Sequence, residues 1–560
     1  MKKVLICLAA AVLFSACSNN REEVRPPMMG WNSWNAYMVD ISDSIIMNAA
    51  DMMIAKGLKE AGYDHVNIDD GYFGYRDSLG YMVPHPVRFP NGMKHVPEYI
   101  HSLGMKAGIY SDAGHNTCGS NYNKDPHGLG AGLWQHEVQD AERYFNDWGF
   151  DFIKIDWCGG SKLGLDVEQR YMRIREIIDS VANKPIDINV CRWRYPGTWV
   201  SKVGSSWRVS GDIRPNWPSI CDMINKNLYL SAYAGGGHYN DMDMMVVGYN
   251  GGKDSAFWED SYGSNFGLTY DEEEAHFTMW CAMSSPLLIG CDLTYIPQET
   301  IDIITNPELV AINKDRLGLQ AHVIQHDDEG YVLAKDIEKR HTGPRAVTLY
   351  NPSDSALTFT VPAETVGFAG GMTVRDLNER KDLGTFEVLE MTLPAHYAKL
   401  LRVEGKRTDI QVYEAEWAYV QDFTRVRQKE VTKYESYPGA SCNAVATSVG
   451  GRTEGNLQWR DVYMGKGGRY AVSVLCAAAP GTEIVLTVNG KEHRTTVTAE
   501  GLNAVNFMAD FKKGVNVVTV GNPEVMIPVV DCIQIYLTTN PPSRAASLLS
   551  PIQTLNSPGS

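Results

Sequence analysis

Short apolar runs that end in polar residues alternate with amphipathic segments over the first 320 residues of the chain. Eight of these runs are predicted strands: 29–34, 65–70, 106–112, 151–156, 186–191, 207–212, 238–243 and 285–290. The segments between them, such as 44–58, 135–148 and 167–181, carry apolar residues at helical spacing. This alternation predicts a (β/α)8 TIM barrel, which places its chemistry at the carboxyl ends of the strands. The alternative is a doubly wound sheet, but the first strand lacks the Gly-rich phosphate turn of that fold.

Acidic residues gather at five of these predicted strand ends. They are Asp69 and Asp70, Asp112, Asp156, Asp212, and Asp241 with Asp243. A single Asp at a strand end is ordinarily a helix N-cap or a turn former. Five such ends that meet at one barrel mouth repel each other unless a substrate or a cation needs them.

The basic residues beside these acids favour a glycosidase over a metal site. A retaining glycosidase needs one ionised and one protonated carboxyl group. Strand alternation places Lys154 beside Asp156, which we expect it to keep charged. Asp212 is then expected to be the harder acid to ionise, unless Arg208 lies close to it instead of binding a substrate hydroxyl or a backbone oxygen. A divalent metal usually needs His ligands, and only His115 and His238 stand nearby in sequence.

Seven motifs in this order carry a family resemblance. They are MGWNSWN (29–35), NIDD (67–70), GIYSD (108–112), KIDWC (154–158), WR with GDI (207–213), NDMDM (240–244) and SPLLIGCDL (285–293). This set resembles glycoside hydrolase family 27, the α-galactosidases and α-N-acetylgalactosaminidases. The resemblance implies a retaining double displacement on a terminal α-D-galactosyl unit, with no cofactor for catalysis.

The same resemblance implies a role for each matching residue. Asp156 resembles the nucleophile and Asp212 the acid/base. The implied substrate-binding residues are Trp34 as a wall of the pocket, Asp69 and Asp70 on the 4- and 6-hydroxyls, Tyr110, Lys154, Arg208 toward O2, and Asp243. Cys118 and Cys158 match two positions that are commonly joined by a disulfide in the family.

The chain also departs from the family pattern near the sugar's 2-position. Arg192 follows Cys191 where the family places Glu or Ser. Arg192 is therefore predicted to bind O2, to accept an anionic group or to point away from the sugar. β-L-Arabinopyranosidase and α-N-acetylgalactosaminidase activities are alternatives, although Asp69, shorter than the Glu of arabinopyranosidases, leaves room for the galactose hydroxymethyl group. A non-catalytic glycan-binding lipoprotein is the alternative of another class, and it predicts the loss of a catalytic acid that the chain retains.

Two β-rich units are predicted after the barrel, which is assigned to 27–320. Short alternating strands indicate an antiparallel β domain over 321–405, and 406–540 is a predicted β-sandwich. The ends of the latter resemble a carbohydrate-binding module of family 35 or 6. Glu414, Glu416 and Asp531 then form a possible structural calcium site, or are simply exposed acids. Trp459 and Tyr434 are either a sugar-stacking platform or core, and the Pro- and Ser-rich residues 541–560 form a predicted disordered tail.

The amino terminus resembles a bacterial lipoprotein signal. Lys2 and Lys3 precede an apolar run over 4–14, and Cys17 follows two small residues. We expect a signal peptide over 1–16, lipidation of Cys17, a linker over 17–26 and an exported protein anchored to a bacterial membrane. An ordinary secretory signal is the alternative.

Composition excludes several other classes of protein. The net charge is −16 and no Lys/Arg-rich run is present, which argues against nucleic-acid binding. The 11 Cys include no CxxC pair, so neither a disulfide scaffold nor a structural zinc site is expected. The expected partner is a carbohydrate with terminal galactose. The sequence leaves the oligomeric state open.

Overall fold

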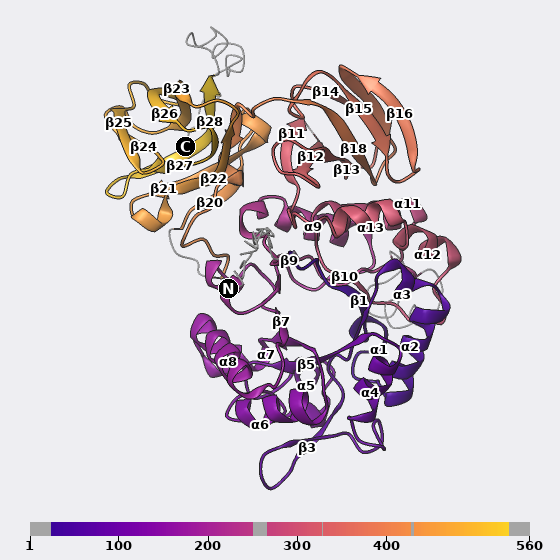
Figure 1. Cartoon of the computed structure of the whole chain (residues 1–560). Coiled ribbons are helices and arrows are strands. Elements are labelled where there is room, and N and C mark those ends of the chain that lie inside the picture. The colour runs from indigo at the N-terminus through magenta and orange to yellow at the C-terminus, as the bar shows by residue number, and fades with distance from the viewer. Residues whose placement is uncertain (1–23, 250–265, 328, 427–430, 537–560) are drawn as a thin grey trace, which may run out of the picture.

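The computed structural model describes residues 24–249, 266–327, 329–426 and 431–536 (Figure 1). These residues form a parallel barrel followed by two β-rich units, which confirms the predicted fold class. The predicted signal peptide, the lipidated Cys17 and the predicted tail 541–560 lie outside the described residues.

Eight parallel strands make the barrel, and all eight match predicted strands. They are β1 (Met29–Asn32), β2 (His65–Asn67), β5 (Lys106–Asp112), β6 (Phe152–Asp156), β7 (Asp187–Val190), β8 (Ser206–Arg208), β9 (Tyr239–Asp241) and β10 (Leu287–Ile289). Their order is β10-β1-β2-β5-β6-β7-β8-β9. A parallel bridge between Met245, which follows β9, and Ile289 of β10 closes the ring.

Helices surround this ring of strands. The longer ones are α2 (Asp43–Ala55), α4 (His95–Ser102), α8 (Val167–Val181), α9 (Trp217–Asn227), α11 (Tyr270–Ala282), α12 (Gln298–Ile304) and α13 (Pro307–Asn313). The shorter ones are α1 (Trp34–Tyr37), α3 (Leu58–Ala61), α5 (Cys118–Tyr122), α6 (Glu137–Ala141), α7 (Cys158–Leu163), η1 (Pro126–Gly128), η2 (Glu142–Asp147), η3 (Thr198–Lys202) and η4 (Ser231–Tyr233). α11 begins with a capping box between Thr269 and Glu272. None of the described helices is long and apolar enough to cross a membrane.

A small hairpin after β2 was not predicted. Its strands are β3 (Phe73–Arg76) and β4 (Met82–Pro84), which pair antiparallel. Arg76 of this hairpin donates to both carboxylate oxygens of Asp140 at 2.7 and 2.9 Å. The hairpin is therefore tied to α6 on the outside of the barrel.

The second unit is an antiparallel β domain that packs on the barrel helix α11 (Figure 1). Its strands are β11 (His322–Asp327), β12 (Gly330–Asp336), β13 (Arg345–Asn351), β14 (Leu357–Pro362), β15 (Phe368–Asp376), β16 (Lys381–Phe386), β17 (Val388–Leu393) and β18 (Tyr397–Arg407). Six of them form one sheet in the order β11-β12-β13-β18-β15-β16, and β14 pairs with β17. Apolar residues between these sheets, such as Leu349, Phe359 and Leu401, give this domain a core of its own.

The third unit is a β-sandwich. Its elements are β19 (Val412–Glu414), η5 (Ala415–Trp417), β20 (Lys433–Ser436), η6 (Ser441–Asn443), β21 (Ala444–Gly450), η7 (Thr453–Gly455), β22 (Leu457–Met464), β23 (Gly468–Ala477), β24 (Glu483–Val488), β25 (Lys491–Thr496), β26 (Leu502–Phe511), β27 (Gly514–Gly521) and β28 (Met526–Tyr536). One sheet has the order β20-β21-β28-β23-β26 and the other β22-β27-β24-β25. The first strand, β19, pairs with the last, β28, so the two ends of the unit lie together.

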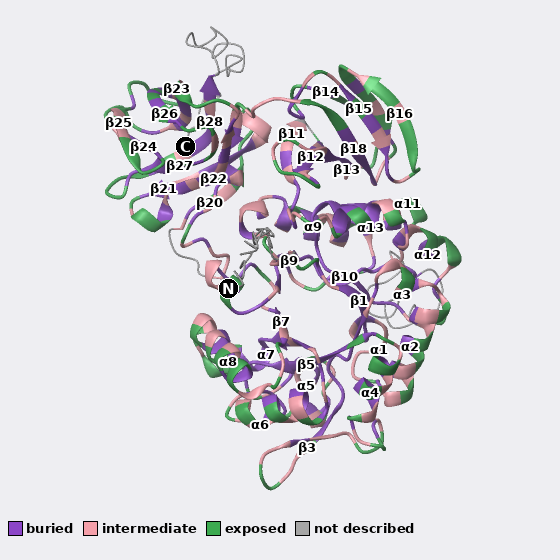
Figure 2. Cartoon of the chain, viewed as in Figure 1, coloured by how far each residue is buried: buried purple, intermediate pink, exposed green. Residues whose placement is uncertain are grey.

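Burial follows the layers of each unit. The barrel strands and the facing sides of the sandwich are buried, while the outer sides of the helices are exposed (Figure 2). Since parallel barrel strands are covered on both faces, their polar ends are left to face only the mouth of the barrel.

Candidate active site

One hollow at the carboxyl ends of the barrel strands contains both predicted catalytic acids. Asp156 ends β6, and Asp212 lies in the loop after β8. Eight of the predicted catalytic and substrate-binding residues line this hollow: Trp34, Asp69, Tyr110, Lys154, Asp156, Arg208, Asp212 and Asp243. The fold therefore gathers residues from β2, β5, β6, β8 and β9 around one space.

Asp156 has the character of a nucleophile. It is 5% exposed, and its Oδ1 is buried with no hydrogen-bond partner among the described residues. Its Oδ2 lies 4.0 Å from the Lys154 Nζ. Burial raises the pKa of Asp156 to about 6, and the charge of Lys154 opposes that rise. Burial outweighs the charge of Lys154 in setting this pKa, but the carboxylate form that we expected from the sequence still dominates at pH 7.

Lys154 links Asp156 to a second acid of the hollow. Its Nζ lies 3.0 Å from Asp69 Oδ2, which also accepts from the Asn32 side chain at 3.0 Å. The ring of Tyr110 lies below the ammonium group, with its centroid 5.5 Å from Nζ. The two carboxylates raise the pKa of Lys154 against the effect of burial, so this side chain stays charged.

Arg208 holds the opposite side of the hollow. Its Nη2 lies 3.1 Å from Asp212 Oδ1, 2.7 Å from Asp243 Oδ2 and 2.6 Å from the backbone oxygen of Gly211. Of the alternatives that the sequence left for Arg208, the structure therefore shows two together: it lies close to Asp212 and it binds a backbone oxygen. The Asp212 side chain is 69% exposed, so this acid faces water in the open hollow.

Asp243 is a buried acid with structural contacts. It accepts from the backbone N–H groups of Ile213 and Met244 at 2.9 and 2.8 Å. Burial raises the pKa of Asp243 to about 7, and Arg208 opposes the rise. Asp243 therefore fixes the loop that carries Asp212 as well as lining the hollow.

Two predicted substrate-binding residues do not line the hollow. Asp70 accepts from the backbone N–H groups of Gly71 and Gly119 at 2.8 and 2.7 Å, so its carboxyl group holds the start of α5. Burial raises the pKa of Asp70 to about 7. Arg192 lies over the ring of Trp157, 5.7 Å from its centroid, which matches the alternative that it points away.

Trp193, the residue after Arg192, lines the hollow instead. Its backbone φ of 58° turns the chain, so that the indole and not the preceding guanidinium reaches the hollow. Asn35, Tyr122 and Met244 line it too and were not predicted as site residues. The sequence does show an aromatic residue next to Arg192, which could have been predicted to contact the sugar. Nothing in the sequence, however, predicts the left-handed backbone conformation at Trp193.

A disulfide joins the two loops beside Asp156. Cys118 and Cys158 are bonded, as the resemblance implied. Asp112 Oδ1 accepts from the backbone N–H groups of Gly114 and Gly159 at 2.6 and 3.0 Å, one from each loop. The loops approach so closely that a Cβ on Gly114 would lie 2.0 Å from the Gly159 backbone. This loop pair braces the strand end that carries Asp156.

A second group of acids lies buried in the β-sandwich. Glu414, Glu416 and Asp531 are 4%, 1% and 2% exposed, so the alternative of exposed strand-end acids is wrong. Glu416 Oε1 and Oε2 and Glu414 Oε2 have no hydrogen-bond partner among the described residues. Burial raises the pKa of Glu414 to about 8 and that of Asp531 to about 7, and it raises the pKa of Glu416 strongly. We call these three residues the acid cluster.

The aromatic residues considered as a sugar platform are used otherwise. Trp459 is 3% exposed, and its indole N–H donates to the Glu414 backbone oxygen at 2.8 Å. The Tyr434 hydroxyl donates to the Ala418 backbone oxygen at 2.7 Å and contacts the Tyr233 hydroxyl at 3.0 Å. Both side chains are therefore packed in the core or against it, as the alternative of core residues predicted.

Comparisons with known proteins agree with this geometry. Residues 26–315 match the family model of α-galactosidase A, and 329–403 match that of the α-galactosidase C-terminal β-sandwich domain. The chain is 37% identical to α-galactosidase 3 of Arabidopsis thaliana over 66% of this chain and 80% of that protein. It is 34% identical to α-galactosidase A of Cellvibrio japonicus over 72% of this chain and all of that protein.

A solved structure gives the same answer for the fold. α-Galactosidase I of Mortierella vinacea matches with a TM-score of 0.60 and 30% identity, over 70% of this chain and 100% of that one. That protein is covered in full, so part of the present chain has no counterpart in it. The third unit of the fold, which begins at Val412, lies beyond the residues that the two family models match. With its barrel, its two acids and these matches, the chain belongs to the α-galactosidase family of glycoside hydrolases, family 27.

Proposed function

We propose that the protein is a retaining, exo-acting α-galactosidase that removes terminal α-D-galactosyl units from oligo- or polysaccharides. The observation that carries this proposal is the unpartnered Oδ1 of Asp156 in a hollow shared with the exposed Asp212. A non-catalytic descendant of the fold has no reason to keep one buried, partner-free carboxylate opposite a second acid. Both acids and their two cations are in place.

The reaction proceeds in two displacements. In the first, Asp156 Oδ1 attacks the anomeric carbon, the bond from that carbon to the leaving oxygen breaks, and Asp212 gives its proton to that oxygen. A sugar ring in the hollow would cover the exposed Asp212 carboxyl group and bring its leaving oxygen within reach of this acid. In the second, Asp212 takes a proton from water, and the resulting hydroxide displaces Asp156 from the anomeric carbon. The configuration of the sugar is retained.

The remaining residues bind and orient the sugar. Asp69 accepts hydrogen bonds from sugar hydroxyls at one side, where its Oδ2 lies 3.0 Å from the Lys154 Nζ. Trp34 and Trp193 supply apolar surface for the faces of the ring. Arg208 holds Asp212 and Asp243 in position from the other side.

The test is a panel of nitrophenyl glycosides assayed with the full-length protein. We expect hydrolysis of the α-D-galactoside at least tenfold faster, in kcat/KM, than that of the α-N-acetylgalactosaminide or the β-L-arabinopyranoside. Proton NMR of the first product formed should show the α-anomer. Release of the β-anomer would exclude double displacement, and preference for another glycoside would reassign the substrate while leaving the mechanism intact.

We also propose that the acid cluster holds a structural calcium ion. The ligand atoms of Glu414 and Asp531 lie within 4.8 Å of each other and of the Cys532 thiol, and carboxylate oxygens are ligands that calcium prefers. The unpartnered oxygens of Glu414 and Glu416 fit a cation between β19, η5 and β28. Terbium luminescence sensitised by nearby Trp459 provides the assay. Calcium should displace terbium from the wild type, and Glu416→Gln should lose most of the signal. An equal signal in both proteins would refute the site.

The localisation that we propose is a bacterial membrane surface, reached through a lipid on Cys17. Lys2, Lys3, the apolar run 4–14 and the small residues before Cys17 support it. Metabolic labelling with a fatty-acid analogue should mark the wild type but not Cys17→Ser. Labelling of both would remove the lipid anchor from the proposal.

A further inference from the structure

The β-sandwich touches the barrel at the loop that carries Trp193. This loop, residues 191–197, connects β7 to η3 and is called here the β7 loop. The Thr424 hydroxyl donates to the Pro196 backbone oxygen at 2.8 Å. The Arg425 backbone N–H donates to the Tyr195 backbone oxygen at 3.0 Å. The sandwich segment 420–425 therefore binds the backbone of the β7 loop directly.

A third hydrogen bond and a group of rings extend this contact. The Thr198 hydroxyl donates to the Gln421 backbone oxygen at 2.6 Å. The Phe423 ring stacks on Tyr233 of the barrel at 4.7 Å between centroids and lies 5.6 Å from Tyr195. Phe423 and Tyr195 are 3% and 1% exposed. This is a packed, hydrogen-bonded joint, unlike the wet contacts of a module on a flexible tether.

The backbone of the β7 loop needs such support. Trp193 has a φ of 58°, in the left-handed region that a bulky residue seldom adopts. A conformation of this kind persists only where the surroundings determine it. Trp193 is two residues from Tyr195, whose backbone oxygen and ring are both held by the sandwich.

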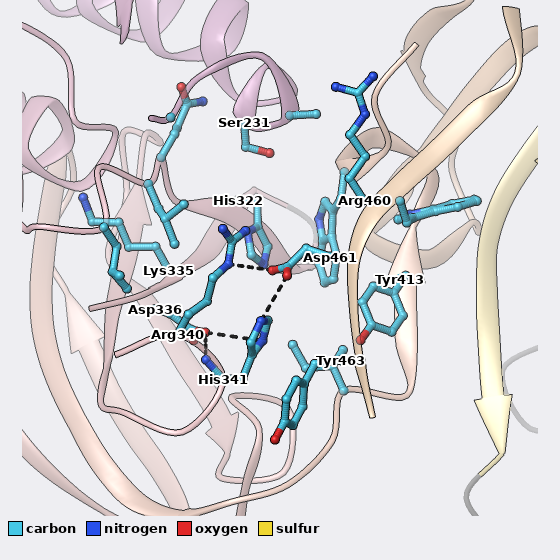
Figure 3. A pocket seen from close by; sticks show the side chains of 18 of the residues that line it. Ser231, His322, Lys335, Asp336, Arg340, His341, Tyr413, Arg460, Asp461 and Tyr463 are labelled. Carbon is cyan, nitrogen blue, oxygen red and sulfur yellow. Dashed lines mark hydrogen bonds and ion pairs between the residues drawn. The ribbon is translucent and has the colours of Figure 1, made fainter. Parts of the chain in front are cut away.

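The sandwich is itself fixed from its other side. Asp461 of β22 accepts from the Arg340 and His341 side chains of the antiparallel domain at 2.7 and 3.0 Å (Figure 3). His341 also stacks on Tyr463, with centroids 4.5 Å apart. These contacts border a cavity of about 510 Å³ where the three units meet. Segment 420–425 is thus presented to the barrel by a unit anchored at two places.

We propose that the β-sandwich is a working part of the active site, which positions Trp193 as a wall of the sugar hollow through Phe423 and Thr424. The inference rests on the proposed glycosidase function. It assigns to Phe423 and Thr424 the role of positioning residues, since neither lines the hollow. Loosening the joint frees the indole and weakens substrate binding. Asp156 at the end of β6 and Asp212 in the loop after β8 stay in place, so kcat changes little.

The first test compares two threonines of the sandwich. Thr424→Ala removes the hydrogen bond to the β7 loop together with one accepted from the Val426 backbone N–H. The control Thr432→Ala removes hydrogen bonds within the sandwich only, to Ser448 and Gly455. We expect Thr424→Ala to raise KM for an aryl α-galactoside about fivefold, as for the loss of one hydrogen bond, with kcat within twofold of wild type. Thr432→Ala should leave KM unchanged. Equal KM values in both variants and wild type would overturn the proposal.

A larger change tests the ring contact in the same way. Phe423→Ala should raise KM more than Thr424→Ala does. The control Phe511→Ala removes a phenylalanine that is equally buried, at 4% exposed, but packs against Tyr470 inside the sandwich. If Phe511→Ala raises KM as much as Phe423→Ala, the effect comes from general damage to the sandwich and the inference is wrong.

A double-mutant cycle tests whether Trp193 transmits the effect. With Trp193→Ala as background, Thr424→Ala should cause no further rise in KM, because the wall that it positions is gone. Additive rises would show that Thr424 acts by another route. The inference and the proposed function fail in different ways. A wild type inactive on all glycosides defeats the function, whereas active variants with wild-type KM defeat only the positioning role.

Discussion

The catalytic hollow and the acid cluster both bury carboxyl groups, but only the hollow supplies cations for them. In the hollow, Lys154 lies between Asp69 and Asp156, and Arg208 lies between Asp212 and Asp243. In the acid cluster no ion pair with Lys, Arg or His joins the three acids, as far as the described residues extend. The protein therefore neutralises one set of charges itself and leaves the other uncompensated.

This difference separates a catalytic from a structural use of the same residue type. A nucleophile must be ionised and free, so its charge has to be balanced by neighbours that do not bind the reacting oxygen. Three buried acids without a counter-charge are either protonated or bound to a cation. The counter-charges, more than the acids, indicate which chemistry each region performs.

The largest predicted difference between the two regions is in kcat, when one acid of each region is replaced by its uncharged amide. Asp156→Asn should lower kcat for an aryl α-galactoside by about 10⁴-fold or more, because no covalent intermediate forms. Glu416→Gln should leave kcat within about threefold of wild type. The thermal midpoint of Asp156→Asn should equal or exceed that of wild type at pH 7, since the change removes a buried charge whose pKa is raised to about 6. Comparable losses of activity in the two variants would contradict the division.

The sequence was enough to predict the barrel and to bring Asp156 and Asp212 to its mouth, because both follow from local patterns. Asp156 is the last residue of β6 and Asp212 follows the end of β8, so the strand pattern assigns both to the barrel mouth, while their separate roles come from the family resemblance. The placement of Arg192 and Asp70 could not be predicted. It depends on the left-handed turn at Trp193 and on the approach of Gly119 to Asp70, contacts that only the folded chain sets. The contact between Thr424 and Pro196 could not be predicted for the same reason, because the two residues are separated by 228 in sequence number.

A second prediction of intermediate size concerns calcium and the acid cluster. Because Glu414 and Asp531 have raised pKa values of about 8 and 7, the folded calcium-free protein binds more protons than the unfolded chain. The contribution of these two acids to stability is therefore greatest at low pH and falls as the pH rises from about 4 to about 8. Calcium replaces these protons, so its stabilising effect should grow from pH 6 to pH 8. At 100 times the Kd the gain is about 2.7 kcal/mol, a rise of a few degrees in Tm.

Scanning calorimetry with calcium or with EDTA, at both pH values, measures this gain. Glu416→Gln is the control that should lose the dependence on calcium while keeping the fold. A gain that is the same at pH 6 and pH 8 would mean that calcium does not compete with protons, and hence that it binds elsewhere.

The smallest predicted effect lies in the pH profile of the hollow. Asp156 must be ionised to attack, so kcat/KM should fall tenfold per pH unit below about pH 6. Lys154 lowers the pKa of Asp156 against burial, so Lys154→Met should move this acidic limb to higher pH, by up to about one unit. Lys154→Arg retains the positive charge and should move it less. Both variants also disturb the contact with Asp69, so a change in KM does not report the charge effect. The pH at which the acidic limb falls does report it. If the limb stays at the same pH in Lys154→Met, the balance of burial and counter-charge assigned to the hollow is wrong.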